Sequence, residues 1–140
     1  MRNKDLRLEC MIQEHSRNTS QLAIAFAEKL GLDSQDAGKL FTAGMYHDIG
    51  KLFIPRSIIE KPGPLDDKEK KHMQKHVLYG AKILKDSGYG KDIVNAVLCH
   101  HEGWDGTGYP GNLKQYKIPL FARILRICDS YDAMTSKRPY

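Results

Sequence analysis

The apolar residues of this 140-residue chain return every three or four positions along most of its length. That spacing places them on one face of an α-helix, whereas a half-buried β-strand would alternate apolar and polar residues. No segment shows a convincing alternation of that kind. The chain is therefore predicted to be all-α, a bundle of five or six helices that forms a single domain over residues 1–140.

Glycines, prolines and capping residues divide this pattern into segments. Residues 51–64 and 103–119 are rich in glycine and proline and are predicted to be mostly loop. Helices are expected to run to about Leu30, from Asp33 or Ser34 to Gly50, and then over residues 66–86, 93–99 and 120–134.

Composition restricts the class of protein further. The chain is 41% hydrophobic and 28% charged, as globular proteins are. Its longest apolar run, residues 22–27, is far shorter than the roughly 20 residues of a membrane span, and no secretory signal opens the chain. Three cysteines without a CxxC pair indicate free thiols in the cytoplasm. The net charge of +5 favours anionic partners such as phosphates or nucleotides, but the basic residues are scattered, so no nucleic-acid binding is predicted.

Histidines and aspartates occupy positions where a core is expected. An isolated buried carboxylate is unfavourable by several kcal/mol, and no Arg or Lys is expected on the same inward face. One inward histidine could simply be a hydrogen-bonded core residue, but a divalent metal cluster would satisfy the whole set. Its members are His15, His47, Asp48, His76, His100, His101 and Asp129. The sixth histidine, His72, lies in a lysine-rich run and is predicted to be on the surface.

These ligand types favour a particular class of metal site. Nitrogen and oxygen donors without a thiolate suit iron, manganese or zinc better than a structural zinc site or a calcium site. Seven ligands are too many for one ion and suit two, which can lie about 3.5–4 Å apart across a shared carboxylate. Asp48 is the candidate bridge.

Four motifs follow one another along the chain: HDIGK at residues 47–51, HHE at 100–102, DGTGYP at 105–110 and RPY at 138–140. Together with the single ligands, they resemble the HD-GYP domain, the bacterial branch of the HD phosphohydrolase superfamily that hydrolyses cyclic di-GMP. The resemblance extends from about His15 to Tyr140. It implies that the seven residues above bind two divalent ions, often iron or manganese, with zinc, nickel or magnesium as alternatives.

The resemblance also assigns roles around the metals. Lys51 matches the lysine that contacts the phosphate, and Tyr109 and Arg138 match positions that line the substrate site. Independently of the resemblance, Trp104 and Tyr109 offer flat faces on which a guanine could stack, although an ordinary packing role would explain them equally well. Members with a third metal carry a glutamate one helical turn before the first histidine, where this chain has Met11, so two ions are expected. The family domain continues past RPY, so this chain is expected to lack the family's C-terminal helices.

By resemblance, the chain is a metal-dependent phosphodiesterase that hydrolyses cyclic di-GMP to pGpG through a hydroxide held by two metals. Further cleavage of pGpG to GMP is left open. Asp48 and Lys51 are the expected catalytic residues. One alternative is another HD-type nucleotide phosphohydrolase. Another is a catalytically weak regulatory module that binds a diguanylate cyclase (GGDEF) protein through the GYP loop. An apolar face left by the missing helices could also support a homodimer.

Overall fold

The structure is a computed structural model that describes the backbone of residues 2–136 and the side chains of residues 12–136. Within these limits it is all-α, as predicted, and contains no strand. Arg138 and the side chain of Met11 lie outside the described residues.

Six helices have eight residues or more. They are α1 (Arg2–Lys29), α2 (Ser34–Tyr46), α4 (Asp67–Gln74), α5 (His76–Asp86), α6 (Lys91–Cys99) and α7 (Leu120–Thr135). A single-turn helix, α3 (Arg56–Ile59), and two 3-10 helices, η1 (Ile49–Phe53) and η2 (Gln115–Lys117), lie in the connections.

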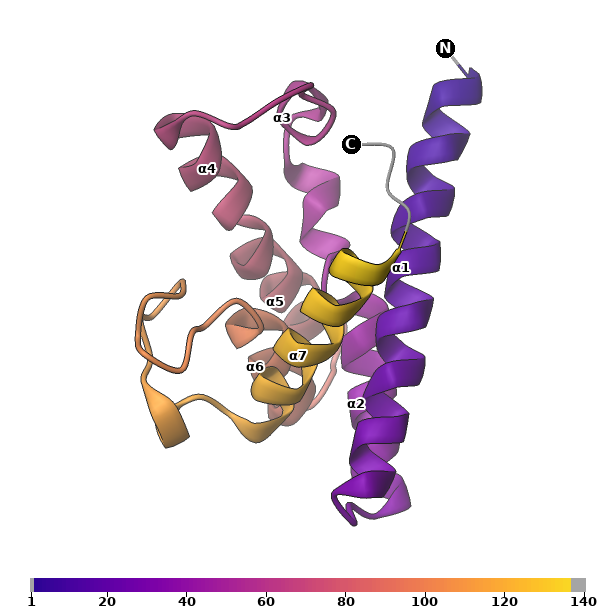
Figure 1. The fold of residues 1–140 in the computed structure, drawn as a ribbon, viewed down its shortest axis with the longest axis vertical. Helices are drawn as coiled ribbons and strands as arrows, with labels where there is room; N and C mark the ends of the chain where they lie inside the picture. The colour runs from indigo at the N-terminus through magenta and orange to yellow at the C-terminus, as the bar shows by residue number, and fades with distance from the viewer. Residues whose placement is uncertain (1, 137–140) are drawn as a thin grey trace.

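The long helix α1 runs along one side of the molecule, where it packs against α2 and α7 (Figure 1). Helix α6 lies at the centre and contacts α2, α5 and α7. The core fills the space where these helices meet, around the buried side chains of Leu40, Leu84, Val97 and Leu125. The core thus joins helices from the beginning, the middle and the end of the chain.

The helix expected over residues 66–86 is two helices. It begins as predicted, because Asp66 and Glu69 form a reciprocal capping box: each carboxylate accepts a hydrogen bond from the other's backbone N–H. Helix α4 ends at Gln74, Lys75 interrupts the helix, and α5 begins at His76. No glycine or proline lies at this break, so the sequence carries no signal for a helix end there.

Gly50 does not end the second helix, contrary to the prediction. Helix α2 ends at Tyr46, and Gly50 lies inside η1, which with α3 occupies part of the segment expected to be loop. A Cβ at Gly50 would lie 1.8 Å from the carbonyl oxygen of His76 and 2.6 Å from the backbone nitrogen of Gly80. The glycine is needed because η1 packs directly on the backbone of α5.

The segment 103–119 is loop apart from the single turn η2, as predicted. It is held by Glu102, whose buried carboxylate accepts hydrogen bonds from the backbone N–H groups of Gly111 (2.6 Å) and Leu113 (2.9 Å). This anchor fixes the loop against the end of α6.

Replacement of Gly50 by alanine should destabilise the fold, because a methyl group there overlaps backbone atoms that cannot rotate away. We expect a loss of about 1–3 kcal/mol or more in the free energy of unfolding, measured by urea denaturation. Gly38→Ala is the matched control: nothing lies within 4 Å of its Cβ position in α2, so it should stabilise the helix by roughly 0.5–1 kcal/mol. Equal effects of the two substitutions would contradict the packing argument.

Candidate metal centre

All seven residues predicted as ligands lie together where helices end or face the middle of the bundle. His47 and Asp48 directly follow α2, His76 begins α5, and His100 and His101 directly follow α6. His15 and Asp129 reach the same place from within α1 and α7. Five helices thus supply donor groups to one site.

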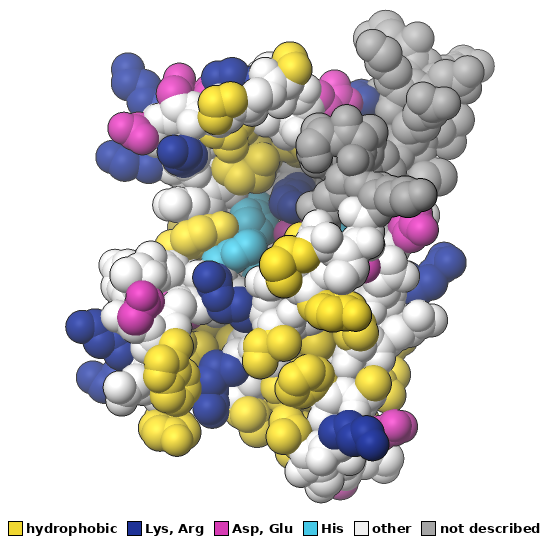
Figure 2. Space-filling model, viewed as in Figure 1, with side chains coloured by type: hydrophobic (Ala, Val, Ile, Leu, Met, Phe, Trp, Pro, Cys, Tyr) yellow, Lys and Arg dark blue, Asp and Glu magenta, His cyan; other side chains and the backbone are white. Residues whose placement is uncertain are grey.

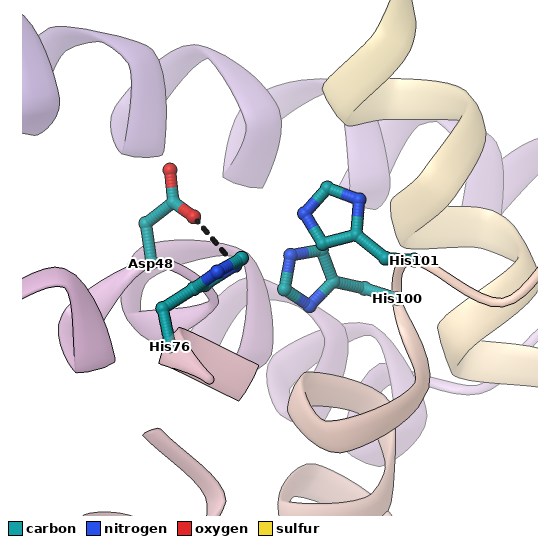
Figure 3. Close-up of side chains that lie close together, drawn as sticks. All are labelled: Asp48, His76, His100 and His101. Carbon is teal, nitrogen blue, oxygen red and sulfur yellow. Dashed lines mark ion pairs between the residues drawn. The ribbon is translucent and has the colours of Figure 1, made fainter. Parts of the chain in front are cut away.

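The donors form two adjacent groups. In the first, one donor atom from each of Asp48, His76, His100 and His101 lies within 4.8 Å of the others (Figure 3). In the second, the same holds for His15, His47 and Asp129. Each group has enough donors to hold one divalent ion.

The carboxylate of Asp48 lies between the two groups. Its Oδ1 is 3.4 Å from Nε2 of His76, on the side of the first group. Its Oδ2 is 3.5 Å from Nε2 of His47 and 4.0 Å from Nε2 of His15, on the side of the second. The two oxygens therefore face different groups, which is the arrangement that a bridging carboxylate requires.

Three of the histidines are oriented by the same local contact. The Nδ1 atoms of His47, His76 and His100 each lie 2.7 Å from the carbonyl oxygen three residues earlier. A carbonyl can only accept, so Nδ1 carries the proton and Nε2 keeps its lone pair for the centre. The Nε2 atoms of His76 and His100 are buried and have no hydrogen-bond partner among the described residues. A cation is the partner that such a lone pair fits.

Burial favours the neutral form of the three histidines in the first donor group. It lowers the pKa of His76, lowers that of His100 well below the ordinary value, and lowers that of His101 to about 4. Neutral imidazoles are the form that binds metals at neutral pH. The first donor group thus matches a divalent cation in charge state as well as in position.

Lys51 corrects one expectation from the sequence. No basic partner was expected for Asp48, yet Nζ of Lys51 lies 2.7 Å from its Oδ2. The tight turn of η1 brings Lys51 back over a residue three positions earlier. Burial alone would raise the pKa of Asp48, but the ammonium of Lys51 beside it holds this pKa well below the ordinary value.

Asp132 belongs to the site and was missed. Its Oδ2 lies 2.5 Å from Nδ1 of His15, while its Oδ1 accepts hydrogen bonds from the side chains of Asn18 (3.0 Å) and Ser136 (2.7 Å). Because Asp132 follows Asp129 by three residues, both lie on the same face of α7, and this spacing could have identified it. The contact orients His15, whose Nε2 lies 2.8 Å from Asp129. Burial alone would lower the pKa of His15, but these two carboxylates raise it.

The remaining predicted residues differ in position. The Tyr109 ring stacks on His101, with centroids 4.9 Å apart and planes 19° from parallel. Trp104 instead lies against Tyr116 and Arg123, outside the two donor groups. His72 is likewise outside both groups, and Arg138 cannot be placed because it lies outside the described residues.

The sequence matches the model of one protein family, described as HD domain, over residues 5–140. It is 43% identical over 127 residues to a cyclic di-GMP phosphodiesterase of Pseudomonas aeruginosa, a match that covers 90% of this chain and 31% of that protein. It is 40% identical over 141 residues to 3'3'-cGAMP-specific phosphodiesterase 2 of Vibrio cholerae, covering 92% and 26%. The chain thus spans about a third or less of the length of these relatives.

Solved structures agree on the fold. An HDG"Y"P protein from Bdellovibrio bacteriovorus superposes with a TM-score of 0.75 at 24% identity, covering 88% of this chain and 40% of that one. The phosphodiesterase HD domain of L. monocytogenes in complex with cyclic-di-AMP superposes with a TM-score of 0.66 at 25% identity, covering 92% and 70%. Among the described residues, no helix is both long and apolar enough to cross a membrane.

Asp132→Asn should weaken metal binding at the second donor group. The asparagine amide can still accept the hydrogen bond from His15, but it lacks the negative charge that makes the imidazole a stronger metal ligand. We expect a tenfold to hundredfold loss in Mn²⁺ affinity at one of two sites, typical of altered partners of metal-binding histidines. Calorimetric titration of the metal-free protein measures it. Asp86→Asn, which changes an exposed carboxylate on α5, is the control. Unchanged affinities at both sites would rule out this role for Asp132.

Proposed function

The chain belongs to the HD domain family, and from this premise we propose that it is a metal-dependent phosphodiesterase that hydrolyses cyclic di-GMP. The observation that carries the proposal is the Asp48 carboxylate, which lies between two groups of metal-type donors and beside Lys51. Such a site suits in-line attack of water on a phosphodiester.

The proposed cofactor is a pair of divalent ions, iron or manganese. Asp48, His76, His100 and His101 would hold one, and His15, His47, Asp129 and the second oxygen of Asp48 would hold the other. When bound, the ions supply Lewis acidity, which lowers the pKa of water and neutralises phosphate oxygens. The imidazole and carboxylate donors match this choice of metals.

Lys51 has the proposed role of stabilising charge on the phosphoryl group. Its ammonium is partly exposed and already lies at the site through Asp48. As negative charge grows on the phosphoryl oxygens in the transition state, a preorganised cation nearby stabilises it more than in the ground state. Asp48 is the proposed bridge, and Tyr109 and Arg138 are proposed to contact the substrate.

A cavity of about 830 Å³ gives the substrate access from the Asp48 side. Its walls are largely apolar, with Ile12, Met45 and Leu52 among the lining residues, and Arg17 and Lys51 add positive charge. A nucleotide has the same division into a flat base and anionic phosphates. Figure 2 shows histidine side chains at the bottom of a hollow, with basic side chains at its edge.

The choice of cyclic di-GMP rests on the names of the relatives. Two of them, from Pseudomonas aeruginosa and Thermotoga maritima, are cyclic di-GMP phosphodiesterases, at 43% and 39% identity. The 3'3'-cGAMP-specific relative supports the broader class of cyclic dinucleotides. The proposed products are pGpG and GMP, and the buried free thiols of Cys99 and Cys128 favour the cytoplasm as the location.

Binding of a diguanylate cyclase is a second candidate function. Trp104 and Tyr116, at the two ends of the segment that carries the GYP motif, are 50% and 80% exposed. Large exposed aromatics of this kind are typical of protein interfaces. The same surface could hold a second copy of the chain.

Anaerobic assays of protein loaded with Mn²⁺ or Fe²⁺ test the proposed activity. We expect about two ions per chain by elemental analysis, and a higher kcat/KM for cyclic di-GMP than for 3'3'-cGAMP or cyclic di-AMP. Chromatography of the products should show pGpG. Full metal loading without hydrolysis of any cyclic dinucleotide would contradict the enzyme and favour the binding module.

Asp48→Asn tests the bridge. Removal of the charge that faces both donor groups should lower Mn²⁺ affinity at both sites, by at least roughly tenfold, and turnover by at least about a hundredfold. Elemental analysis after dialysis and steady-state kinetics measure the two effects. Asp67→Asn, on the exposed first turn of α4, should leave both unchanged. Normal metal content and rate in Asp48→Asn would disprove the bridging role.

A further inference from the structure

A second groove, of about 380 Å³, lies beside the metal centre at Tyr109, whose ring stacks on His101. One wall is the end of α4 and the start of α5, and the other is the loop that carries the GYP motif. The residues that line it include Lys71, Gln74, Lys75 and Tyr109. None of them is among the seven candidate metal ligands.

Two unpaired ammonium groups lie together along this groove. Lys71 and Lys75 are four residues apart in helical backbone, so they lie on one face. Among the described residues, neither has a carboxylate within ion-pair distance. In contrast, Lys39, Lys61 and Lys82 each pair with an aspartate or glutamate at 2.5–3.0 Å. The groove therefore carries positive charge that the chain itself does not neutralise.

The groove is continuous with the metal centre through Tyr109. One part of this residue lines the groove, while its ring stacks on His101 of the first donor group. On the other wall, Lys75 directly precedes His76, a member of the same group. The groove therefore adjoins the first donor group on both of its walls, at Tyr109 and at Lys75.

We propose that this groove binds the second phosphodiester group of a cyclic dinucleotide, with Lys71 and Lys75 as its counter-charges. The inference rests on the proposed function, since such a substrate carries two anionic phosphates and only one of them reacts. For the other phosphate, Lys71, Lys75 and Gln74 line the groove and offer side-chain N–H donors, two of them charged. The pair thereby selects cyclic dinucleotides over diesters with a single phosphate.

The Lys71→Gln/Lys75→Gln variant tests the groove, with kinetics on two substrates, cyclic di-GMP and bis(4-nitrophenyl) phosphate. The second has one phosphate and reports on the metal centre alone. We expect the ratio of kcat/KM for cyclic di-GMP to that for bis(4-nitrophenyl) phosphate to fall roughly ten- to hundredfold, through KM, because charge-assisted hydrogen bonds are lost. The salt dependence of KM for cyclic di-GMP should also decrease.

Lys70→Gln/Lys85→Gln is the matched control, because it removes two unpaired lysine charges from α4 and α5 outside the groove. Cyclic di-GMP binding is also measured in the Asp48→Asn background, where slow turnover does not interfere, and should weaken by the same factor. An unchanged ratio, or an equal fall in the control, would overturn the inference while the proposed function stands. Failure of the unaltered protein to hydrolyse any cyclic dinucleotide would overturn both.

Discussion

The buried carboxylate of Asp48 is the constraint on which this structure depends. It is only 4% exposed, and Lys51 contacts one of its oxygens while imidazoles surround both. A charge in such a position is stable only with compensating positive charge and hydrogen bonds. One lysine supplies part of this, and two divalent ions would supply the rest. The helix ends around Asp48 place the donor groups that could hold such ions.

Helix ends are an effective way to build such a centre. At His47, His76 and His100 the ring turns back to the carbonyl three residues earlier, so the local backbone sets the direction of each Nε2. Bringing the ends together then requires close backbone contacts. Gly50 provides one of them, since η1 and α5 touch at a place where no side chain fits. Precision at the centre therefore depends on packing outside it.

The centre also divides its surroundings into two different surfaces. On the Asp48 side, the cavity is mostly apolar and includes Lys51. On the Tyr109 side, the groove is polar and carries the free charges of Lys71 and Lys75. A substrate with flat bases and two anionic groups would contact both surfaces, whereas a small phosphate ester would contact only the metal centre between them.

The sequence alone determined the helical class, the candidate donors and the loop after His101, because apolar spacing and the chemical types of the residues are local properties of the chain. It also placed polar donors at core positions, which predicted that they meet. Only the tertiary structure decided that Asp48 faces two groups, that Lys51 pairs with it, and that Asp132 orients His15. The break at Lys75 and the close approach of Gly50 to the backbone of α5 likewise became visible only in the structure. These features depend on how separate helices approach one another, and periodicity within one helix carries no information about that approach.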